Sequence, residues 1–541
     1  MTGVLKQKLV RPYYFVVRNL TTVDISRSFR NTDSNLFTQI PKPITNSTDS
    51  VTFLNEGTSW TDGTHIFFYG GLTSYCGGCG GPSSVPPVEA WQYTIADNTW
   101  TDTVFGGTPL NARLSEGSSV QSTVTNKAYY ISGLMIPEGN PVMSDMKDYN
   151  YAVASMLTLN IETKEWANET ISRLNEWNTI GEGYTVILDE VGEQGIIVTF
   201  GGYTHPHGEL ARRLAESQGS QNLNSMEYIS IYDIASGMWY KQQSTGDIPS
   251  WRMAGCSVVV PALDRSSFSI YIFGGMDNTI SGSDGNVYVL SIPSFRWIKV
   301  YSNSTPRIKH KCELLGKHTM LIIGGNIPTN KGGEFYPMPG NCDATSGTFA
   351  NGMGIFDLQT HAWRSDYDAE DTEGYKVSSV ITSVIGGNQN GSATELEPAH
   401  GFNNTNLSTM FKTARKSVND SVSANDAPTS EGKSSTSSSS LSGGAIAGIV
   451  VAVVASVAIF TTWIVFLRKR KKDRRPDYSG EGIQGSSPVS KELVEPDSRQ
   501  AAAELQDTQA AAELDRASEL LELPAEMIHE LPQAREKDDY Q

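Results

Sequence analysis

The sequence contains few cysteines, five in 541 residues: Cys76, Cys79, Cys256, Cys312 and Cys342. Because five is an odd number, they cannot all pair with one another. The "CGGC" segment favours a local disulfide between Cys76 and Cys79 over free thiols, since neither a second pair for zinc nor a βαβ pattern for redox chemistry accompanies it. Cys312 and Cys342 flank one apolar segment, which favours a bridge between them. Cys256, in "AGCSVVV", is expected to be a buried thiol.

Motifs for common enzymatic chemistry are missing. The sequence has no G-x-S-x-G, no H-E-x-x-H and no phosphate-binding loop. His205 and His207, in "FGGYTHPHGE", are candidate metal ligands, because alternate residues of an extended loop can face one ion. No third ligand is identifiable in the sequence, and a solvated loop is the favoured alternative. We therefore expect no catalytic residue, no metal, no cofactor and no enzymatic activity.

Basic residues are outnumbered, with 42 Lys and Arg against 59 Asp and Glu and a formal net charge of −17. This balance argues against a nucleic-acid partner, because such a partner favours a basic patch. Helical periodicity is weak before residue 440, whereas the chain is long and contains 50 glycines. These properties favour a large core of short strands.

One pattern that recurs is an apolar run that ends in glycine. Six segments show it: "HIFFYGG", "KAYYISG", "IIVTFGG", "IYIFGG", "MLIIGG" and "VITSVIGG". The β-branched and aromatic residues favour a buried strand, and glycine lets the strand end sharply because it adopts positive φ. The repeat glycines are Gly70, Gly71, Gly133, Gly201, Gly202, Gly274, Gly275, Gly324, Gly325, Gly386 and Gly387.

A second signal follows five of these six runs. Each is an alternating segment that ends in tryptophan, and the repeat tryptophans are Trp100, Trp166, Trp239, Trp297 and Trp363. Six residues before each tryptophan lies a small polar residue of the kind that favours turns: Thr94, Asn160, Asp233, Ser291 and Asp357. The repeating unit is therefore strand, glycine pair, long loop, strand, turn and strand with Trp.

A unit of this size cannot bury both faces of its own sheet, but units around an axis can bury them against one another, as in a β-propeller. The apolar runs are then inner strands, and the Trp rings fill space between blades. Over roughly residues 10–390, the pattern resembles the kelch-repeat family, in which Gly-Gly follows an apolar run and an aromatic residue and Trp come later. Most intervals exceed the nominal kelch period of about 50 residues. We assign the excess to loops 72–90, 134–150, 203–226 and 326–352, where we expect binding.

The two ends of the array predict how the ring closes. The last glycine pair has no Trp segment after it, whereas "YYFVVRNLTTVDISRSF" looks like the missing half-unit, with Phe29 near the Trp position. We expect these strands to complete the blade begun near Val380, which leaves no free sheet edge. The expected fold class is therefore all-β, a six-bladed kelch-type propeller over residues 1–398. Seven blades remain an alternative if the chain begins upstream.

The composition changes after residue 398. Residues 399–442 are rich in Ser, Thr and Asn, which is typical of a disordered linker or an O-glycosylated stalk. Residues 443–467 include 23 uncharged residues, Ala445–Leu467, enough for one transmembrane helix. "RKRKKDRR" follows at once, so the positive-inside rule places residues 468–541, a mostly disordered tail, in the cytoplasm and the propeller outside.

The N-glycosylation sequons agree with this orientation, because all of them precede the apolar span. They begin at Asn19, Asn46, Asn168, Asn303, Asn390, Asn403, Asn406 and Asn419. The N-terminal "MTGVLKQKLVRPYYFVV" lacks the apolar run of a secretory signal. Our hypothesis is that the start is incomplete or mis-assigned, because the fungal membrane-anchored kelch-like proteins that the chain resembles usually begin with a signal.

The expected function is that of a non-enzymatic, single-pass plasma-membrane protein. Its propeller presents loops for protein or glycan recognition, and its tail couples to a cytoplasmic protein partner. One alternative is a membrane-anchored copper oxidase, because galactose oxidase shares the kelch propeller, although its Tyr, His and cross-linked Tyr–Cys site cannot be placed here. The other is a cytosolic kelch adaptor, which requires that glycosylation be absent.

Overall fold

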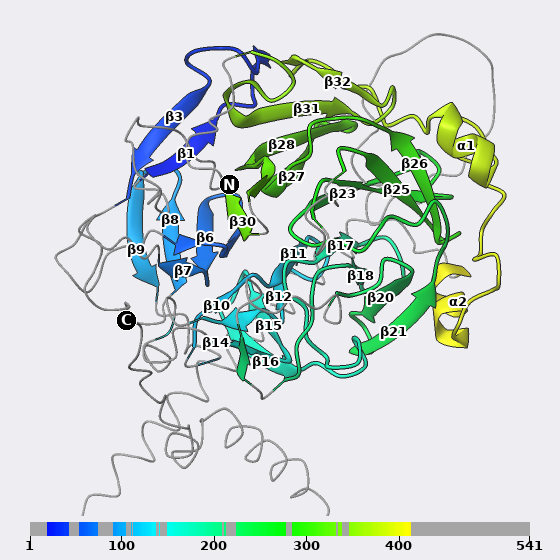
Figure 1. Ribbon diagram of the computed structural model, residues 1–541, viewed down its shortest axis with the longest axis horizontal. Coiled ribbons are helices and arrows are strands. Elements are labelled where there is room, and N and C mark those ends of the chain that lie inside the picture. Colours follow the sequence, from blue (N-terminus) through cyan, green and yellow to red (C-terminus); the bar gives the residue numbers. More distant parts are fainter. Residues whose placement is uncertain are drawn as a thin grey trace, which may run out of the picture. The chain divides into compact units, whose positions relative to one another are not determined.

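Short antiparallel strands dominate the folded part of the chain (Figure 1). In this computed structural model, the α-helices among the described residues are α1 (Ser379–Ile385) and α2 (Thr405–Lys412). The predicted all-β class, with sheets of antiparallel strands, is confirmed. The structure describes residues 19–42, 54–73, 90–103, 110, 112–136, 140, 149–207, 210–212, 223–276, 284–331, 334–337 and 346–412.

Five sheets lie around a common axis, and we number them radial sheets 1 to 5 in chain order (Figure 1). The innermost strands are β5 (Thr58–Thr61), β11 (Ser118–Ser122), β17 (Tyr184–Leu188), β23 (Cys256–Pro261) and β27 (Ile308–Leu315). The second strands are β6 (His65–Tyr69), β12 (Lys127–Ile131), β18 (Ile196–Phe200), β24 (Phe268–Phe273) and β28 (Thr319–Asn326). The third strands are β8 (Ala90–Thr94), β15 (Ser155–Asn160), β20 (Tyr228–Asp233), β25 (Val287–Ile292) and β31 (Met353–Asp357). The outer strands are β9 (Thr99–Thr103), β16 (Trp166–Thr170), β21 (Met238–Gln243), β26 (Arg296–Tyr301) and β32 (Ala362–Arg364), and β22 (Thr245–Gly246) adds to β26 in parallel.

The glycine-ended runs form the second strand of each radial sheet, so they are inner strands, as predicted, although not the innermost ones. Burial explains why the apolar runs occupy this position. A second strand is covered on both faces by neighbouring sheets, and β24 is buried at every position. The innermost strands contain more polar residues, as in "SSVQS" of β11, and they contact one another around the axis.

The glycine pairs join each sheet to the next one. The second glycine donates its backbone N–H across the gap, from Gly71 to Leu114 O (2.7 Å), Gly202 to Arg252 O (2.9 Å) and Gly275 to Arg307 O (2.9 Å). At Gly275 the φ angle is +88°, and a Cβ would lie 2.2 Å from the Tyr184 hydroxyl oxygen. Both the backbone angle and the close approach therefore require glycine there.

Most of the repeat tryptophans extend from an outer strand onto the preceding sheet. The Trp166 ring lies 5.1 Å from the Tyr69 ring, Trp297 lies 5.4 Å from Phe200, and Trp363 lies 5.2 Å from Phe273. Trp239 belongs to a buried cluster with Tyr129, Ile131 and Met156 of sheet 2. Trp100 of sheet 1 contacts Phe68 and Tyr93 of its own sheet. Aromatic packing between sheets thus supplies much of the core.

Residues 378–387 do not form the predicted sixth inner strand, because they form helix α1 and its caps. Ser378 caps the helix by accepting the N–H of Ile381, and Gly386 ends it at a φ of 75°. Ile381 and Ile385, four residues apart, are buried against radial sheet 4. The same "Ile-Gly-Gly" that ends a strand elsewhere here ends a helix.

The N-terminal strands therefore do not complete a blade with residues near Val380. β1 (Asn19–Val23) pairs with β3 (Phe37–Pro41), and β2 (Phe29–Arg30) pairs with β33 (Asp366–Tyr367) just after the outer strand of sheet 5. Phe29 and Leu36 pack against Leu321 and Ile355 of that sheet. The N-terminal segment thus covers sheet 5, next to sheet 1 in Figure 1.

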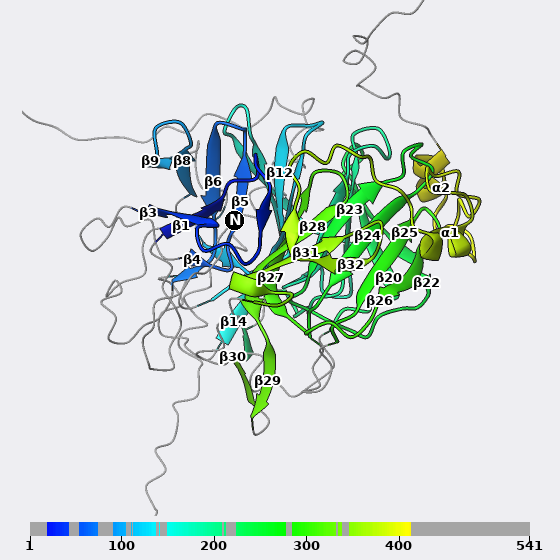
Figure 2. The same ribbon diagram turned by 90° about the horizontal axis from the view of Figure 1, so that it is seen from above.

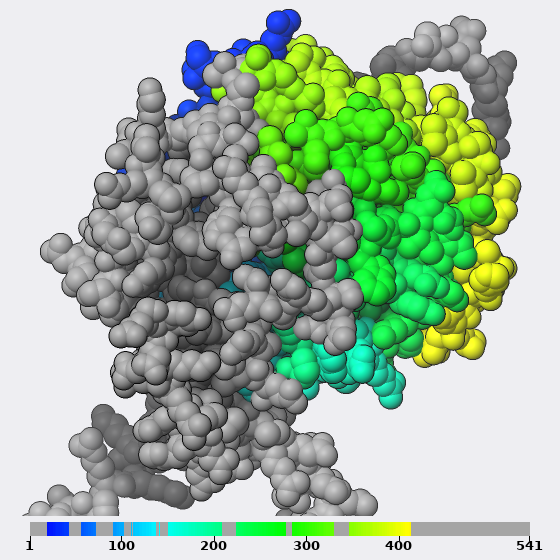
Figure 3. Space-filling view, in the orientation of Figure 1, coloured from blue at the N-terminus to red at the C-terminus, as the bar shows by residue number. Residues whose placement is uncertain are grey.

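The folded region also extends past the expected boundary at residue 398. We define residues 374–412 as the strap, which contains α1 and α2 and lies along the outer edge of sheets 3 and 4 (Figures 1 and 3). Leu407 of α2 is fully buried, and Phe411 stacks on Phe402. No helix in the described residues is long and apolar enough to cross a membrane. The predicted span Ala445–Leu467 lies outside the described residues.

Replacing Gly275 with Ala tests the role of the glycine pairs. We expect Gly275→Ala to lower the free energy of unfolding by more than about 3 kcal/mol, because strain at positive φ adds to overlap with Tyr184. Gly63 is a matched control, since its φ is +87° but nothing lies within 4 Å of a Cβ built there. Gly63→Ala is expected to lose about 1 kcal/mol. Equal losses in urea denaturation would show that close approach between sheets is not what selects glycine.

Candidate functional site

A series of backbone hydrogen bonds links five residues around the axis, where the innermost strands begin. We call Glu56, Glu116, Glu182, Ala254 and Lys309 the axial ring. Four of the N–H groups donate to the carbonyl of the preceding member: Glu116 to Glu56 (3.1 Å), Glu182 to Glu116 (2.6 Å), Ala254 to Glu182 (2.9 Å) and Lys309 to Ala254 (2.7 Å). All five residues have φ between 50° and 61°. This conformation is uncommon outside glycine and persists where the surrounding structure enforces it.

The same backbone brings three acidic side chains and one basic side chain together. The Lys309 ammonium lies 2.5 Å from Glu56 Oε1, 3.0 Å from Glu182 Oε1 and 3.9 Å from Glu116 Oε1. The Tyr203 hydroxyl donates a hydrogen bond to Glu116. Solvent reaches 37% of the Lys309 side chain and 26% of Glu56, so the cluster is enclosed but accessible.

The axial ring contains more acidic than basic side chains, and it is partly buried. Burial and the neighbouring carboxylates raise the pKa of Glu116 well above its ordinary value, and burial raises the pKa of Glu182. Burial acts to raise the pKa of Glu56, but attraction to Lys309 and hydrogen bonds with Glu116 and Lys309 together lower it. The three carboxylates in turn outweigh burial and raise the pKa of Lys309 well above its usual range. Lys309 therefore remains an ammonium ion at neutral pH.

The donor set of the ring sets limits on what it can do. One carboxylate oxygen from each glutamate lies within 4.8 Å of the others, a spacing compatible with a hard cation. Lys309 already supplies the positive charge that these oxygens need. No nucleophile–base pair of the kind used in covalent catalysis stands among the ring residues. The arrangement is suited to accepting hydrogen bonds from hydroxyl or ammonium groups.

Insertions from several sheets emerge on the face of the molecule that carries the ring. Each glycine pair ends a second strand opposite the start of an innermost strand, as the pairing of Tyr69 with Thr58 shows. The chain after each glycine pair therefore leaves beside the ring, and we call this side the loop face. Figure 2 shows β14 (Tyr149–Ala152), β29 (Pro328–Lys331) and β30 (Glu334–Pro337) projecting on it.

Two accessory sheets strengthen this face. One joins β10 (Leu114–Ser115), β13 (Leu134–Met135), β14 and β19 (Leu210–Arg212), so it connects insertions from sheets 2 and 3. The other joins β4 (Leu54–Asn55) to β7 (Leu72–Thr73). The described parts of the predicted binding loops thus carry strands of their own. Residues 74–89, 137–139, 141–148, 208–209, 213–222, 332–333 and 338–345 of these loops lie outside the described residues.

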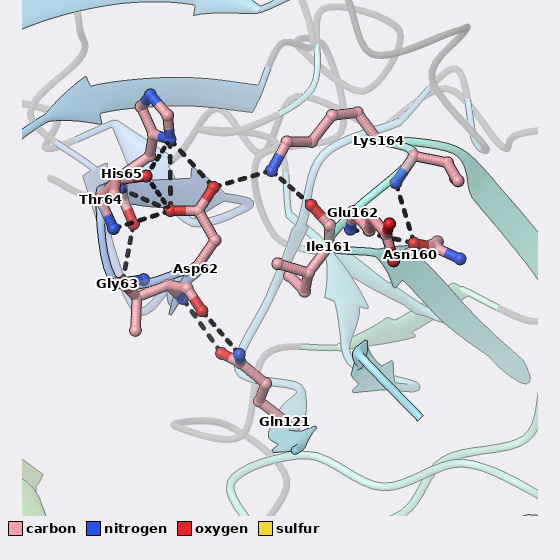
Figure 4. Close-up of polar contacts among 11 residues, drawn as sticks. Asp62, Gly63, Thr64, His65, Gln121, Asn160, Ile161, Glu162 and Lys164 are labelled. Atoms are coloured by element: carbon pink, nitrogen blue, oxygen red, sulfur yellow. Dashed lines mark hydrogen bonds and ion pairs between the residues drawn. The ribbon is translucent and has the colours of Figure 1, made fainter. Parts of the chain in front are cut away.

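The opposite face is joined by contacts between tight turns. Asp62, between β5 and β6, accepts hydrogen bonds from Thr64 and His65 and forms a 3.0 Å ion pair with Lys164 of sheet 2 (Figure 4). These hydrogen bonds outweigh partial burial and lower the pKa of Asp62. Gln121 of sheet 2 donates to Thr61 O at 2.6 Å and accepts the Thr61 N–H at 3.0 Å (Figure 4). The constellation holds sheets 1 and 2 together.

The structure pairs Cys312 with Cys256 in a disulfide, so the predicted bridge from Cys312 to Cys342 and the predicted free thiol at Cys256 are both corrected. The two cysteines lie on β27 and β23, which are adjacent innermost strands with a Cα–Cα distance of 5.4 Å. Position relative to a blade is a poor guide to pairing because residues of neighbouring blades meet at the axis. Cys76, Cys79 and Cys342 lie outside the described residues.

The two candidate histidines do not come together as metal ligands. His205 is buried beside the Tyr203 ring, and burial lowers its pKa. His207 is exposed and approaches the backbone of Ala152 and Ala154. Neither takes part in a group of three potential ligands among the described residues. The structure therefore offers no support for a site built on this pair.

The sequon asparagines that the structure describes lie at the surface. Asn168, Asn303, Asn390, Asn403 and Asn406 are exposed, and Asn19 is half-buried. Asn403 and Asn406 belong to the strap, where the Asn406 side chain donates to the Tyr240 hydroxyl at 3.1 Å. Asn46 and Asn419 lie outside the described residues.

Sequence reasoning missed the axial ring, although a signal for it was present. Glu-Gly precedes three innermost strands, in "NEGTSW", "SEGSSV" and "GEGYTV", and Ala-Gly stands at the same place in "MAGCSV". The position is visible only once these polar segments are aligned as strands. Lys309 departs from the dipeptide pattern, because His310 follows it.

Comparisons with known proteins agree with a kelch-type fold. The chain is similar to a "Kelch repeat-containing protein" from Arthroderma benhamiae, with 25% identity over 406 residues. The match covers 64% of this chain and 55% of the relative, so the chain spans about half the length of that relative. A comparison with models of known protein families finds no match. The resemblance to kelch proteins is thus supported by a relative as well as by the repeats.

Replacing Lys309 with Met tests the electrostatics of the ring. We expect a loss of about 1–3 kcal/mol in the free energy of unfolding near pH 8, at the lower end for a buried pair because solvent reaches Lys309. Glu116 and Glu182 have raised pKa values when folded, so the folded state gains protons as the pH falls. The deficit should therefore shrink towards about pH 5. Lys127→Met, at an exposed site on β12, is the control, and an equal, pH-independent loss in both variants would contradict the prediction.

Proposed function

We propose that this chain is a non-enzymatic cell-surface protein whose loop face binds a protein or glycan ligand. The observation that carries the proposal is the concentration of insertions on one face, around a polar ring that solvent reaches. Rigid scaffolds commonly carry recognition residues on loops of this kind. The similarity to a kelch repeat-containing protein favours a binding role, although a fold alone does not fix function.

The ring suggests which ligand groups suit the base of this face. Three glutamate side chains face one ammonium ion, so the cluster has more hydrogen-bond acceptors than the single ammonium ion can satisfy. Ligand hydroxyl or ammonium groups are therefore the complementary chemistry. Hydroxyl-rich glycans and basic segments of proteins both present such groups.

We also propose how many blades the ring has and how the chain is placed in the membrane. The five radial sheets and the β1–β3 hairpin make up a six-bladed ring in which the hairpin is a reduced blade. The apolar span Ala445–Leu467 crosses the plasma membrane once, with residues 468–541 in the cytoplasm as a site for a protein partner. Exposed sequons on the folded region support an extracellular position.

Glycan occupancy and protease protection test the topology. We expect protease added to intact cells to remove the folded region, and endoglycosidase to lower its mass. Asn168→Gln should remove the mass of one glycan, because Asn168 is an exposed sequon. Asn98→Gln is the control, since Asn98 is exposed but no sequon begins there. A protected, unglycosylated product would favour the cytosolic adaptor.

New glycans placed on either face test the binding role. Gly332→Thr creates a sequon at Asn330 in the β29–β30 region of the loop face, and Asp97→Asn creates one in the β8–β9 turn of the opposite face. With the chain applied to an array of purified glycans and cell-surface proteins, we expect Gly332→Thr to weaken a specific interaction at least about tenfold, because a glycan excludes ligand sterically.

Asp97→Asn should leave the same interaction unchanged, once mass spectrometry shows that both new sites are occupied. Equal effects of the two glycans would contradict a binding site on the loop face. Copper-dependent oxidation of alcohols or sugars by the purified chain would overturn the non-enzymatic part of the proposal.

A further inference from the structure

Cys256, His310 and Cys312 lie together between the innermost strands of radial sheets 4 and 5. One ligand atom from each, a sulfur or a ring nitrogen, lies within 4.8 Å of the other two. His310 and Cys312 are two residues apart on β27, so both project from the same side of that strand, towards Cys256 on β23. Cys256 and His310 are 7% and 3% exposed and Cys312 is half-buried, so most of the group lies in the interior.

The hydrogen bonding of His310 fixes which ring nitrogen is free for a ligand. Its Nε2 lies 3.2 Å from Phe273 O, and because a carbonyl only accepts, Nε2 carries the proton. In the neutral ring Nδ1 then has a lone pair, and this buried atom has no hydrogen-bond partner among the residues that the structure describes. A histidine that binds a metal through one nitrogen typically donates the other N–H to a carbonyl in this way.

The surroundings of His310 leave room for its imidazole. Glycine flanks the ring on two sides: a Cβ at Gly274 would lie 2.5 Å from His310 Cε1, and one at Gly325 would lie 2.7 Å from His310 Cβ. The glycine pairs of sheets 4 and 5 thus create the space that this side chain occupies.

We propose that Cys256, His310 and Cys312 form a site for a thiophilic d¹⁰ metal ion such as Zn²⁺ when the Cys256–Cys312 disulfide is reduced. Two thiolates and one imidazole are the ligands that such ions prefer, and three protein ligands leave zinc one further position. Two thiolates also balance the charge of a divalent ion, which lowers the cost of burying it. The disulfide and the metal site are alternative states of the same residues, because disulfide sulfurs carry no thiolate charge.

An ordinary reductant converts the Cys256–Cys312 disulfide into the metal-binding dithiol. A phosphine breaks the S–S bond, supplies two electrons and becomes a phosphine oxide with oxygen from water, and each sulfur takes one proton. Binding of Zn²⁺ then forms two S–Zn bonds and one N–Zn bond and releases the two thiol protons. A dithiol reductant performs the same reduction and is itself oxidised to a disulfide.

The test uses the full-length chain with Cys76, Cys79 and Cys342 replaced by Ser, so that Cys256 and Cys312 are the only cysteines. After reduction with a phosphine and its removal, Co²⁺ serves as the spectroscopic probe. We expect one Co²⁺ per chain and a thiolate-to-cobalt charge-transfer band, both absent from the oxidised protein. Zn²⁺ should displace Co²⁺ and slow alkylation of the two thiols at least tenfold.

Variants of the histidine separate the metal site from a simple pair of thiols. His310→Leu and His310→Gln should weaken Co²⁺ binding at least tenfold. His318→Leu, at another buried histidine of sheet 5, should leave it unchanged.

Absence of the band in the reduced protein, equal binding by the His310 variants, or binding by the oxidised protein would overturn the proposal. Loss of the β-sheet circular dichroism signal on reduction would overturn it too, because both states must share one fold. Reduced thiols that alkylate equally fast with and without Zn²⁺ are a further contrary result, and this measurement needs no His310 variant.

Discussion

The backbone hydrogen bonds of the axial ring are the constraint on which the rest of the folded region depends. Each bond joins the start of one innermost strand to the next, so the ring fixes both the spacing and the order of the radial sheets. The five residues, none of them glycine, have positive φ angles, and this conformation costs about 1–3 kcal/mol each. The hydrogen bonds and the sheets that meet there hold them in place. Side chains that are distant in the sequence, such as Glu56 and Lys309, consequently come into contact.

The repeats predicted the class of fold because the pattern of apolar runs and tryptophans directly reflects burial. Glycines such as Gly275 and tryptophans such as Trp363 each contact the neighbouring sheet at a position that suits no other residue type as well. The pattern failed at Val380 because "Ile-Gly-Gly" suits the end of a strand and the end of a helix equally. Ser378 and the four-residue spacing of Ile381 and Ile385 favour the helix, but tertiary packing decides the outcome.

The axial ring and the disulfide were less accessible to sequence reasoning for a related reason. Both consist of residues from different sheets that meet only when the sheets are placed around an axis. Cys256 and Cys312 are 56 residues apart, and the neighbouring strand that brings them together is set by topology. The Glu-Gly dipeptides mark the ring in three sheets, yet Lys309, which supplies its positive charge, carries no comparable mark.

The position of the strap decides how mechanical load would enter this fold. Helix α2 lies at the outer edge of sheets 3 and 4, so a pull on its C-terminal end would act first on Leu407 and Phe411, and on Phe402, which stacks on Phe411. These hydrophobic contacts would resist the pull together with hydrogen bonds such as the one from the Asn406 side chain to the Tyr240 hydroxyl. The backbone hydrogen bonds of the axial ring lie at the innermost strands, so a load that enters at α2 would reach them only after these outer contacts had separated.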